Sequence, residues 1–183
     1  MKIATRVLLC LFLGLVSHSA VAQTRLTVSQ ALDLWVTTTE KEVVSAADAM
    51  PEEKYSFAPT AGEFSGVRTF AEQVKHLAAA NYQIAALILG EKPPHSEKNE
   101  TAPDSVQSKA QTMEYLRGSF LSLHRATAGI NERNMLEPAA ASPSGQKNRL
   151  QWAVDAVAHC YDHYGQMVEY LRMNGIVPPA SRR

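Results

Sequence analysis

The sequence predicts an all-α fold, a four-helix bundle. Strand signals are almost absent along its 183 residues, whereas helical periodicity is strong in four long segments. Clusters of proline, glycine and serine separate these segments, as in the connections of a bundle. We therefore expect each segment to contribute one helix.

The first expected helix runs from the capping residue Thr27 to Met50, and Pro51 ends it. Its apolar residues recur at near-helical spacing: Leu32, Trp35, Val36, Val43 and Ala47. The irregular stretch 51–66 comes next and contains Tyr55, Phe57, Pro59 and Phe64. We expect its aromatic side chains to fold back over one end of the bundle.

The second expected helix starts at Ser65 or Gly66 and ends at Leu89, where Gly90 and the following prolines stop it. Its heptad-like stripe comprises Val67, Phe70, Ala71, Val74, Leu77, Ala78, Ile84, Ala85 and Ile88. After a polar loop, 91–103, Asp104 is the expected cap of the third helix, which reaches about Gly129.

The fourth expected helix spans about Gln146 to Asn174, after a loop at 131–145. Its apolar stripe comprises Leu150, Val154, Val157, Tyr161, Tyr164, Val168 and Leu171. Gly175 and two later prolines close it. This helix carries His159 and His163, and the second helix carries His76.

Residues 1–22 have the pattern of a cleaved signal peptide: a short basic start, an apolar run from Val7 to Val16, and a small-x-small site ending at Ala22. The run is too short to span a bilayer core of about 30 Å, so we expect export to the periplasm or outside, with no stable membrane insertion after cleavage. The remaining residues, 23–183, fit a single domain that can bury a core of its own.

Cleavage would remove Lys2 and Arg6 from the 18 basic residues and none of the 18 acidic ones, so the mature net charge is −2. Nucleic-acid binding is not expected, because no basic patch is available to meet phosphates. Cleavage also removes Cys10 and leaves Cys160 alone, so an internal disulfide is excluded. Cys160 is interpreted as a buried, inert residue, with a reactive thiol as the alternative.

Three histidines have the spacing that a divalent metal site needs. His159 and His163 lie at i and i+4, about 40° apart at ~3.6 residues per turn, so both imidazoles can reach one ion. His76 can supply a third nitrogen from a neighbouring helix, as in other bundle sites. Three protein ligands would leave one position for water or substrate.

On a helical wheel the three histidines fall opposite the main apolar stripes, so the alternative is that they are ordinary surface residues. Small and apolar residues on the same faces instead favour a second packed surface, such as the wall of a cleft. Three polar residues near the pair could fix an imidazole tautomer: Asp155, Asp162 and Gln166. The remaining candidates, His95 and His124, are expected to be exposed or locally hydrogen-bonded.

Several segments together resemble the DinB-like family, also called the DinB/YfiT-like metalloenzymes. They are Tyr55–Pro59, Gly66–His76 and His159–Pro179, which includes the HxxxH pair. The resemblance covers nearly the whole mature chain. It implies a four-helix bundle with a metal held by one histidine of the second helix and two of the fourth, here His76, His159 and His163.

The resemblance implies a metalloprotein, either a metal-dependent hydrolase or a thiol-dependent transferase acting on an unknown small-molecule substrate. Imidazole ligands favour a divalent transition metal, with zinc or nickel expected. Relatives in this family are often dimers, so a homodimer is left open. The other interpretation is a non-catalytic helical module that uses its half-apolar faces for binding or interaction.

Overall fold

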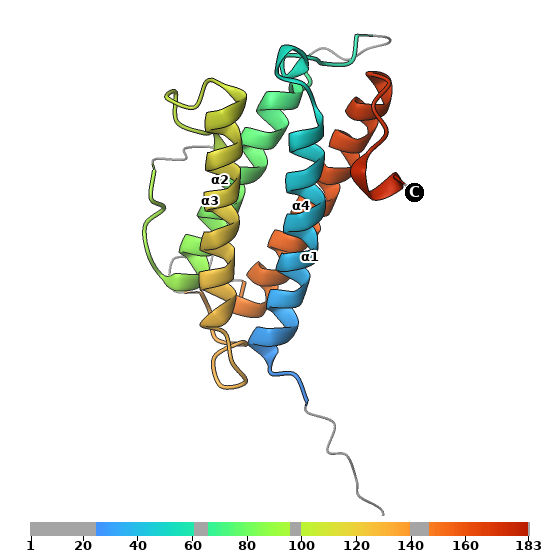
Figure 1. Ribbon diagram of the computed structural model, residues 1–183. Coiled ribbons are helices and arrows are strands. Elements are labelled where there is room, and N and C mark those ends of the chain that lie inside the picture. Colours follow the sequence, from blue (N-terminus) through green and yellow to red (C-terminus); the bar gives the residue numbers. More distant parts are fainter. Residues whose placement is uncertain (1–24, 61–65, 96–99, 140–146, 183) are drawn as a thin grey trace, which may run out of the picture.

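The computed structural model describes residues 25–60, 66–95, 100–139 and 147–182. Four long helices lie side by side as a bundle (Figure 1): α1 (Val28–Ala49), α2 (Phe70–Leu89), α3 (Lys109–Ala128) and α4 (Arg149–Met173). The short 3-10 helices η1 (Glu52–Lys54) and η3 (Pro179–Ser181) follow α1 and α4. Within the described ranges no strand forms, and Pro138 and Asn148 make one isolated bridge. The predicted four-helix bundle is confirmed.

The order of the helices around the bundle differs from their order in the chain. Helix α2 packs mainly against α3 and α4, and α1 packs against the same two helices. The helices therefore follow one another around the bundle as α1, α3, α2, α4. This order makes α2 and α4 neighbours, so side chains from the two histidine-bearing helices can meet.

A continuous apolar core fills the space between the helices. Its largest fully buried side chains include Phe70, Leu77, Leu116, Phe120, Met167 and Leu171. Full burial of each such side chain stabilises the fold by about 1.5–3 kcal/mol. The core therefore fixes the distances between the helix backbones that carry the polar site.

Each long helix begins with a capping box, in which the N-cap side chain and the N3 side chain bond each other's backbone N–H. The N-cap and N3 residues are Thr27 and Gln30, Thr69 and Glu72, Ser108 and Gln111, and Asn148 and Gln151. These boxes correct three predicted starts, because a helix begins where its first N–H groups are satisfied.

The cap of α2 is Thr69, so Gly66 and Val67 precede the helix, and Ser65 lies outside the described residues. The cap of α3 is Ser108, so the prediction that Asp104 caps it is wrong. Helix α4 begins at Arg149 rather than at residue 146, which is also outside the described part. The predicted helix ends agree to within one residue.

Aromatic side chains between α1 and α2 cover one end of the bundle, as predicted. The Tyr55 hydroxyl donates a hydrogen bond to the Ala47 carbonyl at 2.8 Å, and its ring meets Phe70 edge-on at 5.3 Å between centroids. Phe57 packs in the same way against Tyr170, at 5.7 Å. The third predicted aromatic, Phe64, lies outside the described residues.

The predicted leader, residues 1–22, also lies outside the part of the chain that the structure describes. Among the helices that are described, none combines the length and the apolar character needed to cross a membrane.

Candidate metal centre

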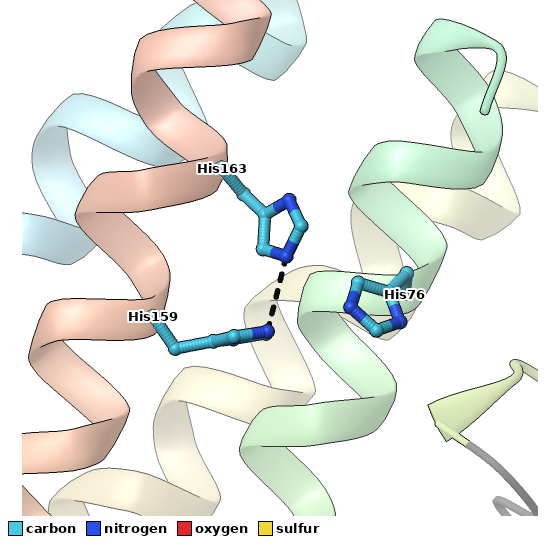
Figure 2. A group of neighbouring side chains, drawn as sticks. All are labelled: His76, His159 and His163. Carbon is cyan, nitrogen blue, oxygen red and sulfur yellow. Dashed lines mark hydrogen bonds between the residues drawn. The ribbon is translucent and has the colours of Figure 1, made fainter. Parts of the chain in front are cut away.

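The three predicted histidines meet between α2 and α4. His76 extends from α2 towards α4, where His159 and His163 extend from consecutive turns (Figure 2). The ring centroids of His159 and His163 are 4.4 Å apart, and the His76 ring lies 4.7 Å from His163 and 5.2 Å from His159. Each pair meets edge to face, so the rings form a compact cluster.

The spacing of the ring nitrogens fits a shared ion. One nitrogen from each histidine lies within 4.8 Å of the other two, and the Nε2 atoms of His159 and His163 are 3.0 Å apart. Three nitrogens at about 2.0–2.1 Å from a tetrahedral metal would be about 3.3–3.4 Å apart. Small rotations of the imidazoles would bring the three donors to that separation, so the cluster could bind a metal ion.

Burial keeps the histidines of α4 neutral. Desolvation, reinforced by His159 and His76 beside it, lowers the pKa of His163 to about 4. The pKa of His159 is also lowered, mainly by burial and then by His76. A neutral imidazole has a free lone pair, which is the form that binds metals.

The second, half-apolar faces predicted for α2 and α4 are packed. Only 8% of the His76 surface and 5% of the His163 surface remain exposed, while His159 is half-buried. Ala79 on α2 and Ala156 on α4 are fully buried on these faces. The stripe predicted for α4 is therefore wrong in part, because Val154 is 55% exposed and the helix turns Ala156 and His163 towards the core instead. The interpretation of the histidines as ordinary surface residues is therefore wrong, because the α2–α4 contact covers them.

The tautomer of His76 is fixed by a residue outside the helices. Its Nδ1 lies 3.1 Å from the backbone carbonyl oxygen of Glu100, which can only accept, so Nδ1 carries the proton. In the neutral ring Nε2 is then unprotonated and available to a metal. The Nδ1 atoms of His159 and His163 are buried, and no described residue hydrogen-bonds them.

The three polar residues considered as tautomer partners have other partners. The Asp155 carboxylate pairs with Lys147, and the Asp162 carboxylate accepts a hydrogen bond from Gln166 at 3.2 Å. Gln166 in turn accepts from the side-chain amide of Gln73 on α2. This last bond links α2 to α4 one turn from the histidine cluster, so it supports the spacing of the two helices.

Cys160 is buried, as predicted, and only 1% of its surface is exposed. Its thiol donates to the side-chain oxygen of Asn81 at 3.3 Å, and the Asn81 amide donates to the Ser119 hydroxyl at the same distance. Burial raises the pKa of the thiol to about 12. The group therefore serves the packing of α2, α3 and α4 and is not a nucleophile.

The other two histidine candidates lie away from the cluster. The ring of His95 packs against Tyr82 and Tyr115, with 5.8 Å between centroids in both pairs. His124 is hydrogen-bonded, but its partners are not local as predicted. They are the carboxylates of Asp33 and Glu40 on α1, because α1 and α3 are neighbours in the bundle.

A cavity of about 510 Å³ opens beside His76, between the start of α2 and the loop before α3. Charged side chains of both signs line it: Arg68, Glu72, Lys75, Glu100 and Asp104. Its volume is in the range of small-molecule binding sites. The cavity adjoins the histidine cluster, because His76 lines both. Sequence reasoning missed Glu100, because a single glutamate in a polar loop has no periodicity that would place it.

The chain matches the family model described as the DinB superfamily over residues 36–167. This range is more than half of the chain and contains His76, His159 and His163. No curated protein matches the chain significantly.

Proposed function

Since the chain belongs to the DinB superfamily, we propose that its three-histidine cluster holds a divalent transition metal, zinc or nickel, and that the protein is a metal-dependent enzyme. The observation that carries the proposal is the convergence of His76, His159 and His163 from two helices. Imidazole donors suit these metals and disfavour magnesium and calcium, which prefer oxygen ligands.

When bound, such a metal acts as a Lewis acid and lowers the pKa of a coordinated water or thiol. Residues around the cluster keep the three imidazoles in the state and orientation that metal binding requires. His159 and His163 stay neutral at pH 7 because they are buried, and the Glu100 carbonyl orients the His76 ring. The adjacent cavity offers space for a small-molecule substrate.

We favour a hydrolase over a thiol-dependent transferase. The predicted leader implies export to the periplasm or beyond, where low-molecular-weight cytosolic thiols are scarce. Export is itself part of the proposal and rests on the sequence of residues 1–22. The intact mass of protein recovered from the periplasm or medium should show cleavage after Ala22.

Metal analysis of untagged mature protein, purified without chelators, tests the metal site. We expect stoichiometric zinc or nickel in the wild type and its loss in His159→Ala. The matched control is His95→Ala, which removes an exposed histidine outside the cluster and should leave the metal content unchanged. Equal metal content in the His159→Ala variant and the wild type would contradict the proposal.

A melting curve with and without chelator gives an independent test. A metal present at 1,000 times its Kd stabilises the native state by about 4 kcal/mol. For a domain of this size, that corresponds to about 8–16 °C in melting temperature. We expect the wild type to lose this increment in chelator and the His159→Ala variant to show no chelator effect.

A second candidate function is a non-catalytic interaction module. It is favoured by an apolar groove of about 250 Å³ between α1 and α4, lined by Leu32, Trp35, Val154 and Val157 among others. Trp35 is 58% exposed and Val154 is 55% exposed there. A second copy of the chain would cover this groove in a homodimer. Light scattering would then give the mass of a dimer for the wild type and a smaller mass for Trp35→Ser. A protein that binds no metal and does not respond to chelator would favour the interaction module over the enzyme.

A further inference from the structure

Glu100 contacts His76 twice, from the loop that precedes α3. Its backbone carbonyl accepts the hydrogen bond from Nδ1, and its carboxylate oxygen Oε2 lies 3.5 Å from Nε2 of the same ring. Glu100 therefore contacts both ring nitrogens of His76, which is one of the three predicted metal ligands.

The Nε2 contact is unfavourable in the neutral ring. Nδ1 holds the ring proton, so Nε2 presents a lone pair to a carboxylate oxygen, and two acceptors face each other. A positive charge between or beside them removes this repulsion. Either a second ring proton or a metal ion bound to Nε2 supplies such a charge, and the experiment below distinguishes the two.

The separation of the two atoms is that of two ligands on one ion. Oxygen and nitrogen donors at about 2.0–2.2 Å from a tetrahedral metal lie about 3.3–3.5 Å apart. The observed 3.5 Å between Oε2 and Nε2 matches this value. The group of donors that lie within 4.8 Å of one another contains the three histidines without Glu100, so the carboxylate would move towards His159 and His163 on binding. The carboxylate side chain is 45% exposed, so packing does not hold it away from the cluster.

The backbone of Glu100 is in an unusual conformation. Its φ of 54° is positive, and within the described residues no other residue except glycine has a positive φ. Side chains rarely adopt this region without a local reason, and such positions cluster at functional sites. Here the conformation places the carbonyl and the carboxylate of one residue on the same imidazole.

Charge balance also favours a carboxylate at this position. Three neutral imidazoles leave the +2 charge of a metal unbalanced in a largely buried site. Asp155 is paired with Lys147, and Glu72 is bonded to the N-cap Thr69. The Asp162 carboxylate accepts a hydrogen bond from Gln166, whereas the Glu100 carboxylate lies against a ring nitrogen of the cluster.

We propose that the Glu100 carboxylate is a fourth protein ligand of the metal. It would bind the metal from the side of His76 that faces the cavity. The proposal rests on the proposed metal site. It makes the donor set three imidazoles and one carboxylate, so the water or substrate of the proposed enzyme would be a fifth ligand or would displace the carboxylate. It also places the fourth ligand between α2 and α3 rather than on one of the four long helices. The metal is therefore bound at the boundary between the bundle and the substrate cavity.

The test compares the Zn²⁺ affinity of wild type, Glu100→Gln and Glu72→Gln, measured by competition with a chromophoric chelator. Glu72 is the matched control because it lines the same cavity, lies one turn before His76, and loses the same charge. The cap of α2 survives in this variant, since glutamine occupies the equivalent N3 position in α1, α3 and α4.

We expect Glu100→Gln to weaken Zn²⁺ binding by at least 10-fold, because loss of groups close to a metal costs about 10–100-fold in affinity. The Glu72→Gln variant should stay within about 2-fold of wild type. The visible spectrum of the Co²⁺-loaded protein should change in Glu100→Gln and not in Glu72→Gln, because it reports the donor set. Glu100→Ala repeats the test without an amide oxygen.

Three results would overturn the proposal. Unchanged affinity and spectrum in Glu100→Gln would remove Glu100 from the donor set. Equally weakened Zn²⁺ binding in Glu100→Gln and Glu72→Gln would show that Glu100 acts only through its negative charge and not as a ligand. Tighter binding in Glu100→Gln would identify the carboxylate as a counter-ion of protonated His76, which competes with the metal. In each case the wild type still binds Zn²⁺, whereas failure of the proposed function would show as no binding in the wild type.

Discussion

Replacement of His124 by glutamine should destabilise the protein in a pH-dependent way. The ring bridges α3 to α1: Nδ1 lies 2.6 Å from Asp33 Oδ1, and Nε2 lies 3.1 Å from Glu40 Oε2. Ionised carboxylates only accept, so both contacts are hydrogen bonds when the imidazole carries two protons. Burial lowers the pKa of His124, but the bonds and charges of the two carboxylates act against it, and the pKa is raised overall.

The magnitude follows from the exposure of the three groups. The side chain of His124 is 25% exposed, those of Asp33 and Glu40 are 49% and 30% exposed, and solvent therefore screens the two ion pairs. Exposed ion pairs each contribute about 0.2–1 kcal/mol, and the shorter bond is at the upper end. We expect the two together to contribute about 1–2 kcal/mol to the free energy of unfolding.

The sign of the pH dependence is set by the raised pKa. The stabilisation is complete below the unfolded-state pKa of about 6.5, and it is lost as pH rises through the higher folded-state value. The deprotonated ring keeps one N–H and turns a lone pair towards the other carboxylate. The contribution should therefore fall by at least half between pH 5.5 and pH 8.5.

Urea unfolding of wild type and His124→Gln in chelator, at both pH values, measures this contribution. The difference between the two proteins cancels the titration of groups that they share, including His159 and His163. Asp33→Asn should remove part of the same pH dependence, and the double variant should add little to His124→Gln. If the difference in unfolding free energy between wild type and His124→Gln is constant with pH, or larger at pH 8.5, the protonated His124 ring does not bond both carboxylates as we infer.

The remaining predictions concern packing. Gly118→Ala would place a methyl group 2.3 Å from the Tyr82 hydroxyl oxygen, so we expect a loss of about 1–3 kcal/mol, which Tyr82→Phe should partly relieve in the double variant. Phe120→Ala should cost about 3–5 kcal/mol in urea unfolding because its ring is fully buried, whereas the exposed Leu121→Ala should stay within about 0.5 kcal/mol. Cys160 should react with a thiol reagent only as the protein unfolds, since its thiol is buried and its pKa is about 12. Labelling of the native protein as fast as of the unfolded chain would contradict this last prediction.

The sequence identified the candidate metal ligands because their spacing is a local property. His159 and His163 share a face of any helix that contains them, whatever surrounds it. The third residue, His76, followed from the resemblance to a family and from the general design of bundle sites. Their burial followed only in part: the small and apolar residues on their faces indicated a packed surface, but the stripe predicted as the main buried face of α4 lies opposite His163, which is itself buried.

The helix starts were also encoded locally in the sequence, although the predicted starts of α2 and α3 were wrong. The correct caps, Thr69 and Ser108, were present in the sequence as capping boxes with Glu72 and Gln111. The predicted starts at Gly66 and Asp104 relied instead on the first apolar residue and on a single acidic cap. A reciprocal pair three residues apart is the better signal, since it satisfies two N–H groups at once.

By itself, the sequence determined the number of helices, their C-terminal ends, most of the buried stripe of α2 and the two-helix origin of the histidine cluster. These features depend on periodicity and capping over three or four residues. The tertiary structure alone decided that α2 and α4 are neighbours, that His124 bonds two carboxylates of α1, and that Glu100 reaches His76. Such contacts depend on the rotation and spacing of whole helices, which many weak apolar contacts set together.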